Sequence, residues 1–242
     1  MSPADGPTGP TAPPHASLGE RVLQQRHGTA EVAAEFYDRQ VHDHLTPAMR
    51  AFVSRQSMLF LATADGLGAC DATFRAGPRG FAVPLGAHGL TFPEYRGNGV
   101  KASAGNLMEN PQLSVLFMDF TEDHIGLHIN GRARLVPDDE QRARYPHLPV
   151  DTAPGRAPEA WVDLLVDDAY VHCSRHIPHL VPAPRTRPRP DRPADAAYFP
   201  DAGSGAGSGA AAEPSDGPVP VGERTQRGRR GVLRLVPTGR DV

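Results

Sequence analysis

The chain has 242 residues, a formal net charge of -3 and 39% hydrophobic residues, which is enough apolar content for one ordinary domain or two small ones. The small negative charge argues against nucleic-acid binding, and no apolar run approaches the roughly 18–20 residues that span a bilayer. The N-terminus lacks the features of a secretory signal, and the two cysteines, Cys70 and Cys173, cannot form a disulfide framework. We therefore expect a cytoplasmic protein with no nucleic-acid or membrane partner.

Proline marks the expected limits of the folded region. Of the 26 prolines, five lie in residues 1–16 and eleven in residues 178–242. Proline-rich segments of this kind bury too little apolar surface to offset the conformational entropy that the chain loses on folding. The sequence therefore predicts disordered tails at 1–16 and 178–242, N-terminal helices at 17–57 that pack on the domain, and a folded domain at 58–177.

The first third of the folded region has the apolar spacing of helices. Thr29 is a suitable N-cap for a helix whose apolar residues recur at three- and four-residue intervals from Val32 to Leu45. Thr46-Pro47 begins a second helix, because proline fits the first helical position. The buried residues of this second helix are expected to be Met49, Phe52 and Val53.

From residue 58 onward the apolar period changes to two, which is typical of strands. Asp65-Gly66 and Gly77-Pro78 are turn signals, and the cleanest alternation of apolar and polar residues runs over 124–136. The expected strands are 58–63, 71–75, 80–85, 90–92, 113–120, 124–136 and 161–173. Short strands joined by tight turns predict an α+β, mainly β fold built on a small antiparallel barrel of about six strands.

One segment, 92–111, combines the features of an anion site. Asn98 is placed to cap a helix, and the flanking glycines leave the first-turn amides unobstructed. Arg96 and Lys101 bracket this N-terminus, where the helix dipole favours negative charge, and Arg75 on an upstream strand would add a third cation. A capped surface helix with incidental basic residues is the alternative. The inner face of the helix is expected to be Val100, Ala104, Leu107 and Met108.

Several stretches, in their order and spacing, resemble the flavin-binding split-barrel proteins of the pyridoxamine 5'-phosphate oxidase superfamily. The resemblance covers residues 20 to about 182, and the late stretch is similar to an uncharacterised bacterial branch. The stretches that carry it are 60–66 (FLATADG), 74–81 (FRAGPRGF), 92–98 (FPEYRGN), 105–111 (GNLMENP), 116–120 (LFMDF), 130–134 (NGRAR) and 169–176 (AYVHCSRH).

The resemblance implies a homodimer of six-stranded antiparallel split β-barrels with FMN in a groove at the dimer interface. It implies an FMN-dependent oxidoreductase that acts on a small-molecule substrate, with the flavin as the reactive group and no catalytic side chain assigned. A deazaflavin cofactor, or a non-catalytic flavin- or haem-binding role, is the alternative, because Gly126 falls where the family commonly has a glutamine at the ring edge. Carried over by position, the residues around the FMN phosphate are Arg75, Arg96, Asn98, Lys101 and Ser103.

The remaining motifs favour structural explanations. His172 and Cys173 point to opposite faces of a strand, so they predict no metal site with His176, and His42 and His44 are expected on the surface of a helix. His128 and His124 lie on the polar side of their strand, facing either solvent or the flavin groove. Arg234-Leu-Val-Pro237 matches a substrate-binding element of the oxidases, but in an arginine-rich tail such matches arise by chance.

Overall fold

The computed structural model describes residues 16–183 and 197–199. The first range belongs to one compact unit, Met1–Pro184, and the second to another, Arg185–Val242. None of the helices in the described part of the chain has the length and apolar character needed to cross a membrane. The helices are α1 (Leu18–His27), α2 (Ala30–Gln40), α3 (Pro47–Val53), α4 (Ala102–Glu109) and α5 (Asp138–Arg144).

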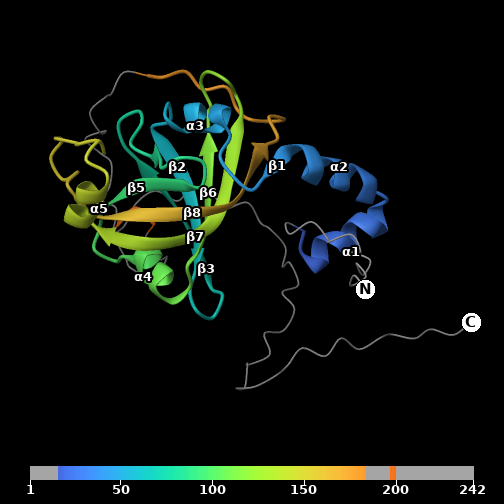
Figure 1. Ribbon diagram of the computed structural model, residues 1–242, viewed down its shortest axis with the longest axis horizontal. Helices are drawn as coiled ribbons and strands as arrows, with labels where there is room; N and C mark the ends of the chain where they lie inside the picture. Colours follow the sequence, from blue (N-terminus) through green and yellow to red (C-terminus); the bar gives the residue numbers. More distant parts are fainter. Residues whose placement is uncertain (1–15, 184–196, 200–242) are drawn as a thin grey trace, which may run out of the picture. The chain divides into compact units, whose positions relative to one another are not determined.

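A single antiparallel sheet forms the body of the compact unit, with strand order β3-β2-β6-β7-β8-β5-β4 and β1 paired to β8 (Figure 1). Six of its strands are long and two have only two residues, so the predicted α+β split barrel is confirmed. The strands are β1 (Val41–His42), β2 (Met58–Ala64), β3 (Cys70–Ala76), β4 (Val83–Pro84), β5 (Gly89–Tyr95), β6 (Gln112–Met118), β7 (Gly126–Pro137) and β8 (Pro158–His172).

Alternating side chains build the core of the barrel. In β2 the residues Leu59, Leu61 and Thr63 are buried, whereas Phe60 between them is 39% exposed. The same two-residue period buries Leu113, Val115 and Phe117 of β6, as expected when one face of a strand meets the core. Hydrophobic burial inside the curled sheet is therefore the main stabilising contribution.

Two predicted elements differ from the structure near the N-terminus and after β3. The helix predicted to run from Thr29 to Leu45 is shorter, because α2 stops at Gln40 and has no buried residue. Leu45 lies beyond the helix and is buried in the core. The expected strand 80–85 is reduced to β4, since a turn at Gly80 and burial of Phe81 divert the chain. The helix begun by Thr46 and Pro47 is confirmed, with the Thr46 hydroxyl accepting from the Met49 N–H.

Helix α5 was not predicted, whereas α1 lies in the region 17–57 where helices were expected, although its own bounds were not predicted. Helix α1 begins at a capping box in which Ser17 and Glu20 each accept from the other's backbone N–H. The proline-rich tails of the prediction fall mostly outside the described residues, and Arg234-Leu-Val-Pro237 falls wholly outside them.

Strand β8 contains a bulge opposite β7: Asn130 pairs with Asp168 and Gly131 with Val166, so Asp167 is the extra residue. The register with β8 shifts between Asn130 and Gly131, and a Cβ at Gly131 would overlap the carbonyl oxygen of Leu165 on β8. Only glycine permits this close approach of two backbones.

We predict that Gly131→Ala lowers the free energy of unfolding by about 3 kcal/mol, because a backbone carbonyl cannot move aside as a flexible side chain would. Gly105→Ala is the matched control, since a Cβ at this helical position meets no atom within 4 Å and helix propensity favours alanine by about 0.5–1 kcal/mol. Urea denaturation measures both, and equal stability of the two variants would contradict the prediction.

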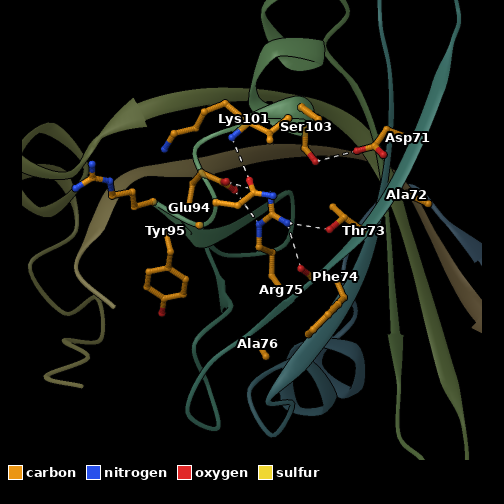
Figure 2. A pocket seen from close by; sticks show the side chains of 15 residues that line it. Asp71, Ala72, Thr73, Phe74, Arg75, Ala76, Glu94, Tyr95, Lys101 and Ser103 are labelled. Carbon is orange, nitrogen blue, oxygen red and sulfur yellow. Dashed lines mark hydrogen bonds and ion pairs between the residues drawn. The ribbon is translucent and has the colours of Figure 1, made fainter. Parts of the chain in front are cut away.

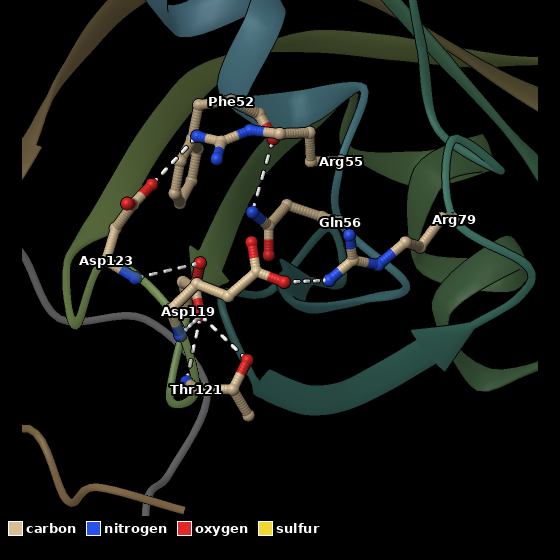
Figure 3. Close-up of polar contacts among 8 residues, drawn as sticks. Phe52, Arg55, Gln56, Arg79, Asp119, Thr121 and Asp123 are labelled. Atoms are coloured by element: carbon tan, nitrogen blue, oxygen red, sulfur yellow. Dashed lines mark hydrogen bonds and ion pairs between the residues drawn. The ribbon is translucent and has the colours of Figure 1, made fainter. Parts of the chain in front are cut away.

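Asp119 organises the connection between β6 and β7 (Figure 3). Its carboxylate accepts hydrogen bonds from the N–H groups of Thr121, Glu122 and Asp123 at 2.9–3.3 Å. Burial raises the pKa of Asp119, but these backbone donors outweigh burial and hold the pKa below its ordinary value. The ionised form therefore stabilises the folded state.

We predict that Asp119→Asn lowers the free energy of unfolding by about 1–2 kcal/mol at pH 7, because charge-assisted hydrogen bonds are replaced by neutral ones. The folded-state pKa is depressed, so this advantage of the wild type is complete above about pH 4 and is lost as the pH falls through the folded-state value. Thermal unfolding of both proteins from pH 7 to pH 2 checks whether their melting temperatures converge as the pH falls.

Asp123→Asn is the control in the same loop. Asp123 forms an exposed ion pair with Arg55, which contributes less than about 1 kcal/mol. A stability difference between wild type and Asp119→Asn that stayed constant to pH 2 would disprove the role of the Asp119 charge.

Candidate functional site

A cavity of about 580 Å³ lies between β3, the end of β5 and the start of α4 (Figure 2). Its volume is in the range of small-molecule sites. Residues from two separate parts of the sequence, 71–76 and 94–103, line it, and all five residues predicted for the cofactor phosphate are among them. These five are Arg75, Arg96, Asn98, Lys101 and Ser103.

Arg75 and Glu94 form an ion pair in the wall of this cavity. Nε and Nη2 of Arg75 donate to the two carboxylate oxygens of Glu94 at 2.9 and 3.0 Å, with side chains only 17% and 11% exposed. Arg75 lies on β3 and Glu94 on β5, two strands that are not hydrogen-bonded neighbours in the sheet. The pair therefore links the two sides of the split in the barrel.

The loop before α4 differs from the prediction. Asn98 does not cap the helix, because its Oδ1 accepts from the N–H of Val100 within the loop. The N-cap is Lys101, which has a left-handed backbone with φ of 58° and makes no side-chain capping bond. Gly97 and Gly99 also have positive φ, so the chain turns sharply and the helix begins three residues later than expected.

The buried face of α4 agrees with the prediction at Leu107 but not at Val100 or Met108. Ser103 and Leu107 are the buried residues, whereas Val100 and Met108, expected on the inner face, are 72% and 83% exposed. Hydrogen bonds anchor α4 along the β2–β3 hairpin, the firmest being from Asn106 Nδ2 to Thr63 Oγ1 at 2.9 Å. The N-terminus of α4 is thus held at the cavity.

The first-turn amides of α4 have no capping side chain and, like those of any helix, no intrahelical acceptor. Ala102 and Ser103, which carry two of these amides, line the cavity. Positive helix-end potential and free donors together suit an anionic group. The structure brings the predicted residues together at this uncapped helix end, and anion binding there stays a prediction.

The cations of the cavity differ in their partners. Lys101 forms an ion pair with Glu159 of β8, and Ser103 Oγ lies 3.5 Å from Asp71. Arg96 is exposed and forms no ion pair within residues 16–183. Arg96 is therefore the cation most available to a ligand.

Sequence reasoning missed Glu94, Tyr95 and Asp71 as lining residues. A charged residue at the end of an otherwise apolar strand was the available signal for Glu94, which is 8% exposed. Burial, with a further contribution from Asp151, raises the pKa of the Tyr95 phenol. This side chain stays neutral and supplies a hydrogen-bonding wall to the cavity.

The histidines of the other motifs lie on or beside the strands of the barrel. No group of three or more metal-ligating side chains comes together in the described part of the chain. His128 and His172 share a hydrogen bond of 2.9 Å on neighbouring strands, and burial, followed by the charge of His172, lowers the pKa of His128. His42 lies on β1, not on the predicted helix, and Cys173 is exposed just after β8.

Comparison with known proteins identifies the family. The family model described as pyridoxamine 5'-phosphate oxidase matches residues 45–173, more than half of the chain. The chain belongs to the pyridoxamine 5'-phosphate oxidase family. No curated protein matches it.

Solved structures similar to this member of the pyridoxamine 5'-phosphate oxidase family share low identity with it. HupZ of Group A Streptococcus is 15% identical, covering 52% of this chain and 92% of its own, with a TM-score of 0.38. HutZ, a heme storage protein of Vibrio cholerae, is 17% identical. The match covers 52% of this chain and 94% of HutZ, with a TM-score of 0.35. An FAD binding protein of Mycobacterium smegmatis is 14% identical. The match covers 53% of this chain and 96% of that protein, with a TM-score of 0.38.

We predict that Arg75→Gln and Glu94→Gln each lower the free energy of unfolding by about 3 kcal/mol, because each leaves a largely buried charge without its partner. The double variant should lose less than the sum of the two, with a coupling of at least about 1 kcal/mol. Urea denaturation of the four proteins measures this coupling.

The exposed Arg39–Glu35 pair is the control cycle, with an expected coupling below about 0.5 kcal/mol. Additive effects of Arg75→Gln and Glu94→Gln would show that the pair does not connect β3 to β5.

Proposed function

We propose that this protein is a flavin-dependent oxidoreductase that binds FMN in the cavity between β3, β5 and α4. The observation that carries the proposal is the uncapped N-terminus of α4 opening into a cavity of about 580 Å³ beside Arg96 and Lys101. Free amides, a helix dipole and cations together match a terminal phosphate. The residues present therefore fit the phosphate end of a flavin nucleotide.

The bound flavin would supply the hydride chemistry. Arg96, Lys101 and the first-turn amides of α4 would hold its phosphate, and Asn98 would keep the loop in place through its bond to the Val100 N–H. Tyr95, whose neutral phenol lines the cavity, would orient the ligand through a hydrogen bond. We assign no side chain as catalytic acid or base.

We further propose that the protein is a homodimer in which the cofactor lies between the subunits. Phe60 on β2 and Phe74 on β3 are directly opposite each other in the sheet. Both are exposed, at 39% and 58%, and Phe74 also lines the cavity. An exposed aromatic pair at the border of a binding cavity suits coverage by a second subunit.

A deazaflavin cofactor, or a non-catalytic role in binding flavin or haem, is the second candidate. The observation that favours it is Gly126, where a Cβ would lie 2.6 Å from Met118 Sδ and 2.7 Å from His172 Cβ. The packing excludes any larger side chain at this position, so the ring-edge contact expected from the family cannot come from residue 126.

The test compares FMN binding by the wild type and by the double variant Arg96→Gln/Lys101→Gly, in which glycine tolerates the left-handed backbone at position 101. Loss of two charge-assisted contacts should weaken FMN binding at least about 100-fold. Quenching of FMN fluorescence measures the affinity, and bleaching of the bound flavin by NAD(P)H tests for electron transfer.

Arg39→Gln, remote from the cavity-lining residues, should bind FMN like the wild type. Equal affinity of the wild type and the double variant would show that the phosphate binds elsewhere. A purified protein with a Soret band, or one that binds a deazaflavin and not FMN, would support the second candidate instead.

A further inference from the structure

A carboxylate is built into the wall of the cavity that we propose for a phosphate. Glu94 is 8% exposed, follows the apolar residues of β5 and lines the same cavity as Arg96 and Lys101. A buried carboxylate next to a bound phosphate is repulsive unless a cation neutralises it. In this structure that cation is Arg75 (Figure 2).

The hydrogen bonds of Arg75 show that its guanidinium is almost fully used within the protein. Nε and Nη2 donate to Glu94, and Nη1 donates to the carbonyl oxygen of Phe74 at 3.1 Å and, more weakly, to Thr73 Oγ1 at 3.4 Å. A guanidinium has five N–H donors, so a single one, on Nη2, has no acceptor among the described residues. Arg75 therefore has little capacity left for a phosphate.

We propose that Glu94 is a specificity-determining residue of this cavity, a resident anion that keeps Arg75 from binding the ligand's phosphate. The proposal rests on the proposed flavin site and narrows it. The attraction for phosphate then comes from Arg96, Lys101 and the amides of α4. Arg75, which the sequence analysis grouped with these cations, instead neutralises Glu94 and links β3 to β5.

The charges around the cavity lead to a specific expectation about ligands. Arg75, Arg96 and Lys101 are opposed by Glu94 and Asp71 in the lining, and Lys101 is also paired with Glu159 outside it. The two carboxylates in the lining therefore reduce the preference for a phosphorylated over an unphosphorylated ligand below what the cations and the α4 amides alone would give. Removal of the charge of Glu94 should free Arg75 and increase that preference.

The experiment measures the ratio of riboflavin to FMN dissociation constants, which isolates the contribution of the phosphate. Relative to the wild type, Glu94→Gln should raise this ratio about 10-fold or more, because a charge-assisted contact to phosphate becomes available. Arg75→Gln should lower the ratio, since an unpaired Glu94 repels the phosphate. The double variant Arg75→Gln/Glu94→Gln should match the wild type within about 3-fold.

The double variant decides between Glu94 as a resident anion and Arg75 as a direct phosphate ligand. If Arg75 contacts the phosphate in the wild type, the double variant will fall well below the wild-type ratio, and this result overturns the proposal. An unchanged ratio in Glu94→Gln overturns it as well. Glu109→Gln, on α4 but bonded to the Gly66 N–H away from the cavity, controls for loss of a carboxylate in general.

A second measurement separates this proposal from the identity of the cofactor. Thermal unfolding is followed with increasing inorganic phosphate at constant ionic strength. Glu94→Gln should gain a phosphate-dependent rise in melting temperature that exceeds the rise in the wild type, in Glu109→Gln and in the double variant. If the wild type binds neither flavin, the proposed function fails, and the same phosphate series still supports or overturns the role of Glu94.

Discussion

The ion pair between Arg75 and Glu94 joins two strands that share no backbone hydrogen bonds. Strand β3 ends one side of the sheet and β5 lies near the other, and the bidentate contact at 2.9 and 3.0 Å holds them together. Charges removed from water in this way are tolerated only when they are paired and hydrogen-bonded. This contact therefore contributes to the position of the cavity wall.

The same pair determines how the cavity can treat an anion. A guanidinium committed to a carboxylate, a peptide carbonyl and a hydroxyl is a structural element rather than a free ligand-binding group. The adjoining cations are less constrained, with Arg96 on an exposed loop and Lys101 at the uncapped end of α4. Arg75 therefore has a structural role between β3 and β5, whereas Arg96 and Lys101 are the cations placed to contact a ligand.

Much of the candidate site could be predicted from the sequence because its main residues are close along the chain. Arg96, Asn98, Lys101 and Ser103 lie within eight positions, and a glycine-rich turn before a helix is a local pattern. The cap was wrong because capping preferences describe side chains, whereas a left-handed backbone at Lys101 moved the helix start. Glu94 was missed because its partner is on a distant strand, which no local pattern reveals.

By itself the amino-acid sequence determined the period of the strands, the helix at Thr46-Pro47 and the α+β barrel, because each follows from local spacing of apolar residues and turn formers. Only the tertiary structure decided which charges meet, such as Arg75 with Glu94, and where two backbones approach too closely for a side chain, as at Gly131. The physical reason is that pairing across a split and bulges between strands depend on the relative position of distant segments, which the packing of the whole barrel determines.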